Sequence, residues 1–213
     1  MTQEAMLAQV REEIRALFAG DFSGHDTWHT LRVERTAAAI AREEKCNELV
    51  VRLGALLHDT DDPKLFRTTD YANARSILRR AGVDAQTEAQ VIAAIRTVSF
   101  KGEDTETPDT PEGCALQDAD RLDAIGAIGA ARAFAYGGSH SRPLYDPDTP
   151  PRLHMNEAEY RANTGSSLNH FYEKLFLLKD MMNTAAGKRM AQARDAYLHS
   201  FAEEFLAEWA GEK

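Results

Sequence analysis

The chain has 213 residues, of which 43% are hydrophobic and 28% charged, a balance that excludes disordered and collagen-like proteins and is typical of a globular protein with a sizeable core. Its 34 acidic residues outnumber its 25 basic ones and give a formal charge of -9, which argues against binding to polynucleotides and to anionic membranes. The uninterrupted apolar runs are short, as at residues 37–41, whereas a bilayer-spanning helix needs roughly 18 apolar residues.

Two further features of the sequence indicate the cellular compartment of the protein. The first 18 residues are amphipathic and contain three glutamates, whereas a signal peptide has a basic start and an apolar stretch. Cys46 and Cys114 are too few and too isolated for a disulfide framework or a thiolate zinc site. We therefore expect a cytoplasmic protein.

Apolar residues recur at intervals of three and four along most of the chain, and no alternating run of β-branched residues interrupts them, so the sequence predicts an all-α fold. Asp26, Asn47 and Asp84 are expected N-caps of the second, third and fifth helices. In chain order the predicted helices cover residues 2–18, 27–44, 50–57, 69–80, 85–98, 112–136, 156–182 and 184–210.

The longest irregular segment is expected between the predicted sixth and seventh helices. Residues 139–154 contain four of the seven prolines. Loops longer than about 12–15 residues in compact domains are often functional. We interpret this segment as a candidate lid.

Three polar side chains interrupt apolar helix stripes and are therefore expected to point inward from three different helices. They are His29, ahead of Val33, Ala37 and Ile40; His58, after Val51, Gly54 and Ala55; and Asp120, ahead of Ala124, Ala127 and Ala131.

Carboxylates gather in the two segments that contain His58 and Asp120. The six are Asp59, Asp61, Asp62, Asp118, Asp120 and Asp123. Because a buried, unpaired carboxylate costs several kcal/mol, a cation is expected to compensate them.

One divalent metal ion held by His29, His58, Asp59 and Asp120 satisfies this requirement. Two imidazoles and two carboxylates suit Mn, which we take as the first expectation, as well as Fe, Co, Ni, Zn or, less comfortably, Mg. Four protein ligands on a six-coordinate ion leave positions for water and a substrate oxygen, so the ion can activate the water and polarise a phosphoryl group.

These four residues, with Asp120 in the run Ala-Asp-Arg-Leu, resemble the H…HD…D signature of the HD-domain metal-dependent phosphohydrolase superfamily. Segments 25–33, 55–64, 117–129 and 170–175 are similar to one bacterial branch that includes nucleotide pyrophosphohydrolases. The resemblance implies a single all-α HD domain over residues 1–213 with one mononuclear site. Its metal-binding core would span about residues 21–136, and helices at about 156–211 would complete the cleft.

The resemblance also implies roles around the metal. Asp62 matches a carboxylate that orients the attacking water in related HD enzymes, where Glu is commoner; Asp61 and Asp123 are competing candidates. Lys64 is expected to be a second catalytic residue, together with Asp62. The expected phosphate-binding residues are Arg67, Arg121, His170 and Lys174. His170 equally fits a buried, hydrogen-bonded histidine, and Lys64 and Lys174 also fit solvated surface lysines.

The first functional hypothesis is a phosphohydrolase that converts (deoxy)nucleoside triphosphates to monophosphates and pyrophosphate. A phosphomonoesterase or cyclic-nucleotide phosphodiesterase with the same metal is the alternative enzyme. A non-catalytic nucleotide- or metal-binding module is the alternative of another class, and an oligomerisation scaffold built from the last two helices is compatible with each of these. The expected partner is a small nucleotide or phosphate ester. The sequence does not specify the base or the sugar of this ligand, nor the oligomeric state of the protein.

Overall fold

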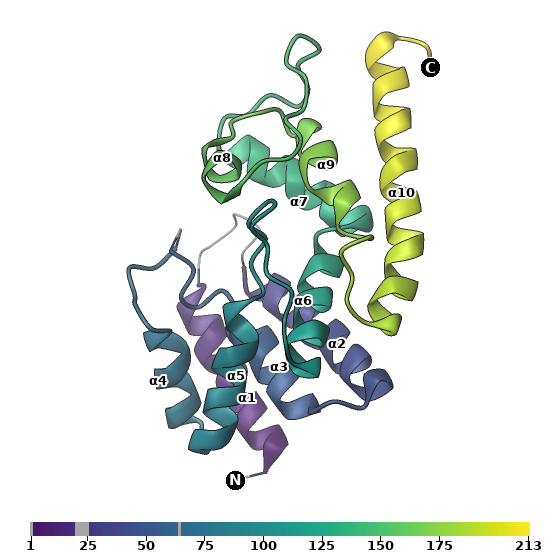
Figure 1. Cartoon of the computed structure of the whole chain (residues 1–213). Helices are drawn as coiled ribbons and strands as arrows, with labels where there is room; N and C mark the ends of the chain where they lie inside the picture. The colour runs from purple at the N-terminus through teal and green to yellow at the C-terminus, as the bar shows by residue number, and fades with distance from the viewer. Residues whose placement is uncertain (1, 20–25, 64) are drawn as a thin grey trace. The chain divides into compact units, whose positions relative to one another are not determined.

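The computed structural model describes residues 2–19, 26–63 and 65–213. Within these residues the chain forms ten α-helices and one short 3-10 helix, and the only β feature among them is an isolated bridge between Lys101 and Glu103. Figure 1 shows the helices as coiled ribbons joined by loops. The all-α prediction is confirmed. Within the described ranges, every helix is too short or too polar to cross a membrane.

The chain divides into two compact units. The first unit comprises Met1–Ser99 and Thr107–Asp120, and the second comprises Phe100–Glu106 and Arg121–Lys213. The division falls inside one helix, α6 (Pro111–Asp123). Whether the chain behaves as a single domain stays a prediction.

The first unit contains α1 (Gln3–Leu17), α2 (Thr27–Glu44), α3 (Glu48–Leu57), α4 (Ala72–Arg80), α5 (Ala85–Arg96) and most of α6 (Pro111–Asp123). Helix α3 packs against α1, α2 and α5. It is apolar on nearly all sides, with Val50, Leu53 and Leu56 fully buried, as expected for a helix surrounded by others. This central helix ends directly at His58.

The three predicted N-caps are present. The carboxylate of Asp26 accepts from the amide of His29 at 2.9 Å, Asn47 caps α3 in the same way at 3.3 Å, and Asp84 caps α5. Helix α4 begins three residues later than predicted because Asp70 and Tyr71 adopt left-handed conformations, with φ of 53° and 54°. A helix cannot continue through such residues.

A buried ion cluster joins the first three helices. The carboxylate of Glu34 on α2 accepts from Arg11 of α1 at 2.6 and 2.9 Å and from Arg52 of α3 at 3.0 and 3.1 Å. Glu34 is 4% exposed. Because both partners clamp one buried carboxylate, the cluster fixes the helices against one another.

The second unit contains α7 (Gly126–Ser139), α8 (Glu157–Ala162), α9 (Asn169–Glu173), η1 (Leu175–Leu177) and α10 (Ala185–Ala210). The prediction of one helix over 112–136 is wrong, since α6 ends at Asp123 and α7 starts at Gly126. Gly126 has a φ of 77°, and a Cβ on Gly129, in the first turn of α7, would clash with the carbonyl oxygen of Ala124, so both positions favour glycine. The apolar stripe expected after Asp120 is therefore also wrong; Ala127 and Ala131 are exposed.

The prediction of one helix over 156–182 is wrong as well. Helix α8 begins in a capping box of Asn156 and Glu159 but ends after six residues. The side-chain amide of Asn163 donates to the buried carboxylate of Glu173 at 2.6 Å, which holds residues 163–168 out of helical conformation. The last helix is confirmed, between a Thr184 N-cap and a left-handed Gly211.

The proline-rich segment is irregular, as predicted, and is fastened within the second unit. The carbonyl oxygens of Pro143 and Leu144 accept from backbone amides at 2.9 and 3.0 Å. Asn169 donates to the carbonyl oxygen of Thr149 at 2.8 Å, and Glu173 accepts from the amide of Arg152 at 3.1 Å. These contacts hold the segment along its length, and movement as a lid stays a prediction.

Candidate metal centre

Two imidazoles form the centre of the site. His29 lies in the first turn of α2, beside its Asp26 cap, and is 1% exposed. His58 follows the last residue of α3, and its Nδ1 lies 2.8 Å from the carbonyl oxygen of Ala55. A carbonyl oxygen only accepts hydrogen bonds, so we assign the proton to Nδ1, which leaves a lone pair on Nε2 of the neutral ring.

Carboxylates of Asp59 and Asp120 complete the cluster, and all four residues belong to the first unit. The Nε2 atoms of His29 and His58 are 3.1 Å apart. Asp120 Oδ1 lies 3.3 Å from Nε2 of His29 and 3.5 Å from Nε2 of His58. Asp59 Oδ2 lies 3.5 and 3.4 Å from the same two atoms. The structure thus brings together the four side chains that the sequence singled out.

The spacing of these donors fits one metal ion. Two imidazole nitrogens bound at about 2.1 Å to a shared ion, at angles of 90–110°, lie about 3.0–3.4 Å from each other. The ligand atoms of His29, His58 and Asp120 all lie within 4.8 Å of one another. Imidazole and carboxylate donors suit transition metals, so this cluster can hold a divalent cation.

The charges of the cluster also require a cation. Burial by itself would lower the pKa of His58, but the carboxylates of Asp59 and Asp120 outweigh burial and raise this pKa to about 9. Burial pushes the pKa of Asp120 upward, yet its contacts with His29 and His58 dominate and hold it well below the usual value. A bound proton or a metal ion must therefore balance the carboxylates, and a metal ion would displace that proton.

Access to the cluster lies on the Asp120 side. The Asp120 side chain is 27% exposed, whereas the side chains of His29 and His58 are 1% and 3% exposed. Solvent can therefore reach the cluster past this carboxylate, while the imidazoles are shielded.

The turn after Asp59 is fastened to the start of α4 through Asp61. The Asp61 carboxylate accepts from the amides of Asn73 at 3.0 Å and Ala74 at 2.9 Å, and from the Thr68 hydroxyl at 2.6 Å. These bonds occupy both oxygens and cap α4 from outside the helix. Asp61, expected as a competitor for the water-orienting role, thus has a structural function.

The neighbouring Asp62 is half-buried in the same turn, with its amide 3.2 Å from the carbonyl oxygen of Asp59. Arg67 is exposed. Lys64 lies outside the described residues. The catalytic and phosphate-binding roles of these three residues stay predictions.

The remaining candidates belong to the second unit. Arg121 is buried and donates to the carbonyl oxygen of Met181. Asp123, the other competitor of Asp62, is buried and pairs with Arg132 at 2.9 Å. Phosphate binding by Arg121 and water orientation by Asp123 stay predictions.

The ammonium of Lys174 lies 5.1 Å from the ring centre of Phe100 and 6.0 Å from that of Tyr160, and the His170 ring lies 6.4 Å from Tyr160. All four are partly exposed. A cation over aromatic faces beside an imidazole is chemically suited to bind a nucleotide.

Sequence reasoning did not identify Glu34 and Glu173. Both are buried carboxylates that hold neighbouring segments in place through hydrogen bonds. A signal for Glu34 was available, because it shares a face of α2 with the buried Ala38 and Ala41. No local pattern pointed to Glu173, because its partners Asn163 and Arg152 depend on how the second unit folds.

Comparisons with known proteins agree with this geometry. The HD domain family profile matches residues 28–125. The protein YpgQ of Bacillus subtilis is 35% identical over 200 residues, which cover 92% of this chain and 90% of YpgQ. YpgQ has been crystallised in complex with ADP, and that structure matches with a TM-score of 0.76 at 32% identity over 95% of this chain and 96% of that one.

Two further crystal structures are similar over nearly the whole chain. A Lactobacillus plantarum protein has a TM-score of 0.88 and 38% identity, covering 99% of this chain and all of its own. An HD-superfamily hydrolase from Bacillus thuringiensis has a TM-score of 0.77 and 36% identity, covering 98% of this chain and 99% of its own. The chain therefore belongs to the HD-domain phosphohydrolase superfamily.

Proposed function

We propose that this protein hydrolyses ribo- or deoxyribonucleoside triphosphates to monophosphates and pyrophosphate. The reaction would use one divalent metal ion, for which manganese is the preferred candidate. The observation that carries the proposal is the buried cluster of two imidazole nitrogens and two carboxylate oxygens, spaced 3.1–3.5 Å from nitrogen to nitrogen and from nitrogen to oxygen. The proposed metal ligands are His29, His58, Asp59 and Asp120.

The nucleotide part of the proposal is supported by a relative. Bacillus subtilis YpgQ binds ADP in its crystal structure, and it shares 35% of its residues with this chain over most of both lengths. We infer that this chain also takes a nucleotide. An acidic protein needs a local cation for this, and the metal ion would supply it.

When bound, the metal ion would lower the pKa of water and neutralise phosphate charge. The chain's own residues have separate tasks. The Ala55 carbonyl holds the His58 ring with its Nε2 lone pair toward the cluster. Asp62, in the turn that Asp61 fastens to α4, would accept a proton from the attacking water. Water would attack the α-phosphorus while the α–β phosphoanhydride bond breaks and pyrophosphate leaves.

We propose phosphate-binding roles for five basic residues. Lys64 and Arg67 follow Asp62 along the chain, and the others are Arg121, His170 and Lys174. Because phosphoryl transfer depends on positioning and charge neutralisation, each of these groups would act by hydrogen bonding to phosphate oxygens.

Product analysis tests the proposal. The full chain is incubated with Mn²⁺ and each ribo- and deoxyribonucleoside triphosphate, and the products are separated by ion-exchange chromatography. We expect monophosphate and pyrophosphate in equal amounts. Orthophosphate as the only phosphate product would contradict cleavage at the α–β bond, and tight binding without any product would indicate a binding module.

Variants link this activity to the cluster. His58→Ala removes one proposed ligand, and we expect activity to fall at least 100-fold. His199→Ala is the matched control, because its side chain is 49% exposed and lies in the second unit. Equal activity of His58→Ala and the unaltered chain would refute the proposed ligand set.

A further inference from the structure

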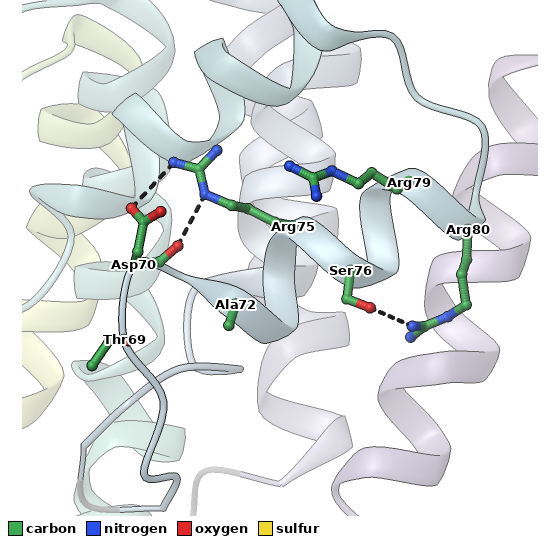
Figure 2. A pocket seen from close by; sticks show the side chains of 7 residues that line it. All are labelled: Thr69, Asp70, Ala72, Arg75, Ser76, Arg79 and Arg80. Atoms are coloured by element: carbon green, nitrogen blue, oxygen red, sulfur yellow. Dashed lines mark hydrogen bonds and ion pairs between the residues drawn. The ribbon is translucent and has the colours of Figure 1, made fainter.

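A cavity lies beside α4 in the first unit. Its volume is about 440 Å³, and no residue of the metal cluster lines it. Cavities of about 300–1,000 Å³ are the usual size for small ligands. The lining residues, drawn in Figure 2, are Thr69, Asp70, Ala72, Arg75, Ser76, Arg79 and Arg80.

Three arginines are among the lining residues, although the chain as a whole is acidic, with a formal charge of -9. Arg75 and Arg79 are one helical turn apart and so lie on the same face of α4. Arg80 projects on the neighbouring side, where it donates to the Ser76 hydroxyl at 2.6 Å (Figure 2). The cavity therefore concentrates groups that bind phosphate oxygens through paired N–H donors.

Two of these arginines share one buried acid. Glu88 of α5 accepts from Arg75 at 3.1 Å and from Arg79 at 3.0 and 3.1 Å. Arg80 has its own partner, Glu13 of α1, at 2.6 Å. Glu88 thus neutralises only one of the two charges that it contacts.

The acid among the lining residues, Asp70, is held weakly. Its carboxylate lies 3.4 Å from Arg75, and its side chain is 82% exposed. Exposed ion pairs of this kind contribute little to stability, so an anion can displace Asp70 at little cost. The Arg79 side chain is 67% exposed, and two of its five N–H donors point to Glu88, so it can contact an anion without leaving Glu88.

We propose that this cavity binds an oligophosphate, either inorganic or carried by a nucleotide, at a site separate from the metal cluster. Arg79 and Arg75 provide the charge, and the hydroxyls of Thr69 and Ser76 lie within the same lining. The proposal does not depend on the hydrolysis reaction.

Calorimetric titration tests the site. The full chain is dialysed against a chelator, so that the probe cannot be held by a metal ion, and is titrated with inorganic tripolyphosphate at low salt. We expect saturable binding that Arg79→Gln weakens at least tenfold. Absence of binding, or unchanged binding by Arg79→Gln, would overturn the proposal.

Two further variants distinguish binding in the cavity from a general effect of positive charge and from a loss of folding. Arg42→Gln removes the same charge from a side chain that is 65% exposed and lies outside the cavity. It should bind within twofold of the unaltered chain, and an equal loss would show diffuse electrostatics instead. Arg79→Lys keeps the charge without the paired donors, so an intermediate loss with an unchanged unfolding midpoint supports the site, and unaltered binding by this variant counts against it.

Competition identifies the source of the phosphate. ADP is added to the chain saturated with tripolyphosphate. Displacement from the Arg79-dependent site supports a nucleotide ligand there, and retention of tripolyphosphate supports an inorganic one.

Discussion

Nε2 of His29 lies 3.1 Å from Nε2 of His58, although the two residues are 29 positions apart, one in α2 and the other directly after α3. The rings stand edge to face, with centroids 5.1 Å apart and planes at 71°. Because the Ala55 contact leaves a lone pair on Nε2 of His58, the two nitrogens are arranged to share a proton or a metal ion.

This relationship predicts that a divalent metal stabilises the protein. At a concentration 100 times its dissociation constant, a ligand of the folded state adds about 2.7 kcal/mol to the free energy of unfolding. We expect Mn²⁺ to raise the thermal midpoint of the unaltered chain, and His58→Ala to abolish this shift. Metal content measured by mass spectrometry should fall in parallel, whereas an undiminished metal content in this variant would refute the site.

Asp61 and Asp62 are adjacent but should respond differently to substitution. Asp61→Ala removes four hydrogen bonds to its carboxylate and should lower the free energy of unfolding by about 2 kcal/mol. Asp62→Ala should lower kcat at least 100-fold with little change in stability or metal content. Urea unfolding and steady-state kinetics on both variants check this, and the reverse pattern would exchange the two roles.

Glu34 should be one of the most sensitive positions of the first unit. Glu34→Ala leaves the guanidinium groups of Arg11 and Arg52 without their buried partner, which should cost about 3 kcal/mol. Glu12→Ala is the matched control, because its side chain is 71% exposed and pairs with its exposed helix neighbour Arg15, so it should change stability by less than about 0.5 kcal/mol. Urea unfolding measures both, and similar losses would mean that burial of Glu34 contributes nothing.

The hydrogen bonds from Arg75 and Arg79 to Glu88 predict a pH-dependent contribution to the free energy of unfolding. Hydrogen bonds from Arg79 lower the pKa of Glu88 below its usual 4.5; burial raises it by less, and the bond from Arg75 lowers it further. A carboxyl group with a lowered folded-state pKa stabilises the fold above its unfolded-state pKa and loses this effect as the pH falls through the folded-state value. Glu88→Gln should therefore be less stable than the unaltered chain at pH 7, with a difference that shrinks below about pH 4.5. A difference in urea midpoint that stays constant down to pH 3 would contradict this.

Lys174 distinguishes substrate binding from packing in the second unit. If its ammonium binds phosphate, Lys174→Met should raise KM for a triphosphate at least tenfold. Loss of the contacts with Phe100 and Tyr160 should at most cost about 1 kcal/mol of stability. Steady-state kinetics checks this, and an unchanged KM with only lower stability would assign Lys174 to packing.

The sequence alone determined the all-helical class, the N-caps at Asp26, Asn47 and Asp84, and the four side chains that the structure brings together as a candidate metal centre. Each of these follows from local periodicity or from a motif whose spacing is read directly along the chain. His29 and His58 interrupt apolar stripes, so their inward direction did not depend on any distant contact.

Tertiary structure decided the breaks after Asp123 and Asn163 and the separate tasks of the clustered aspartates. Helical periodicity continues across both breaks, but Gly126 turns the chain at a left-handed φ and Asn163 hydrogen-bonds to a carboxylate ten residues away. Asp61 and Asp62 are chemically identical in sequence, and only the packing of α4 engages one of them as a cap. Local spacing specifies the direction of a side chain, whereas its partner depends on which distant segment folds beside it.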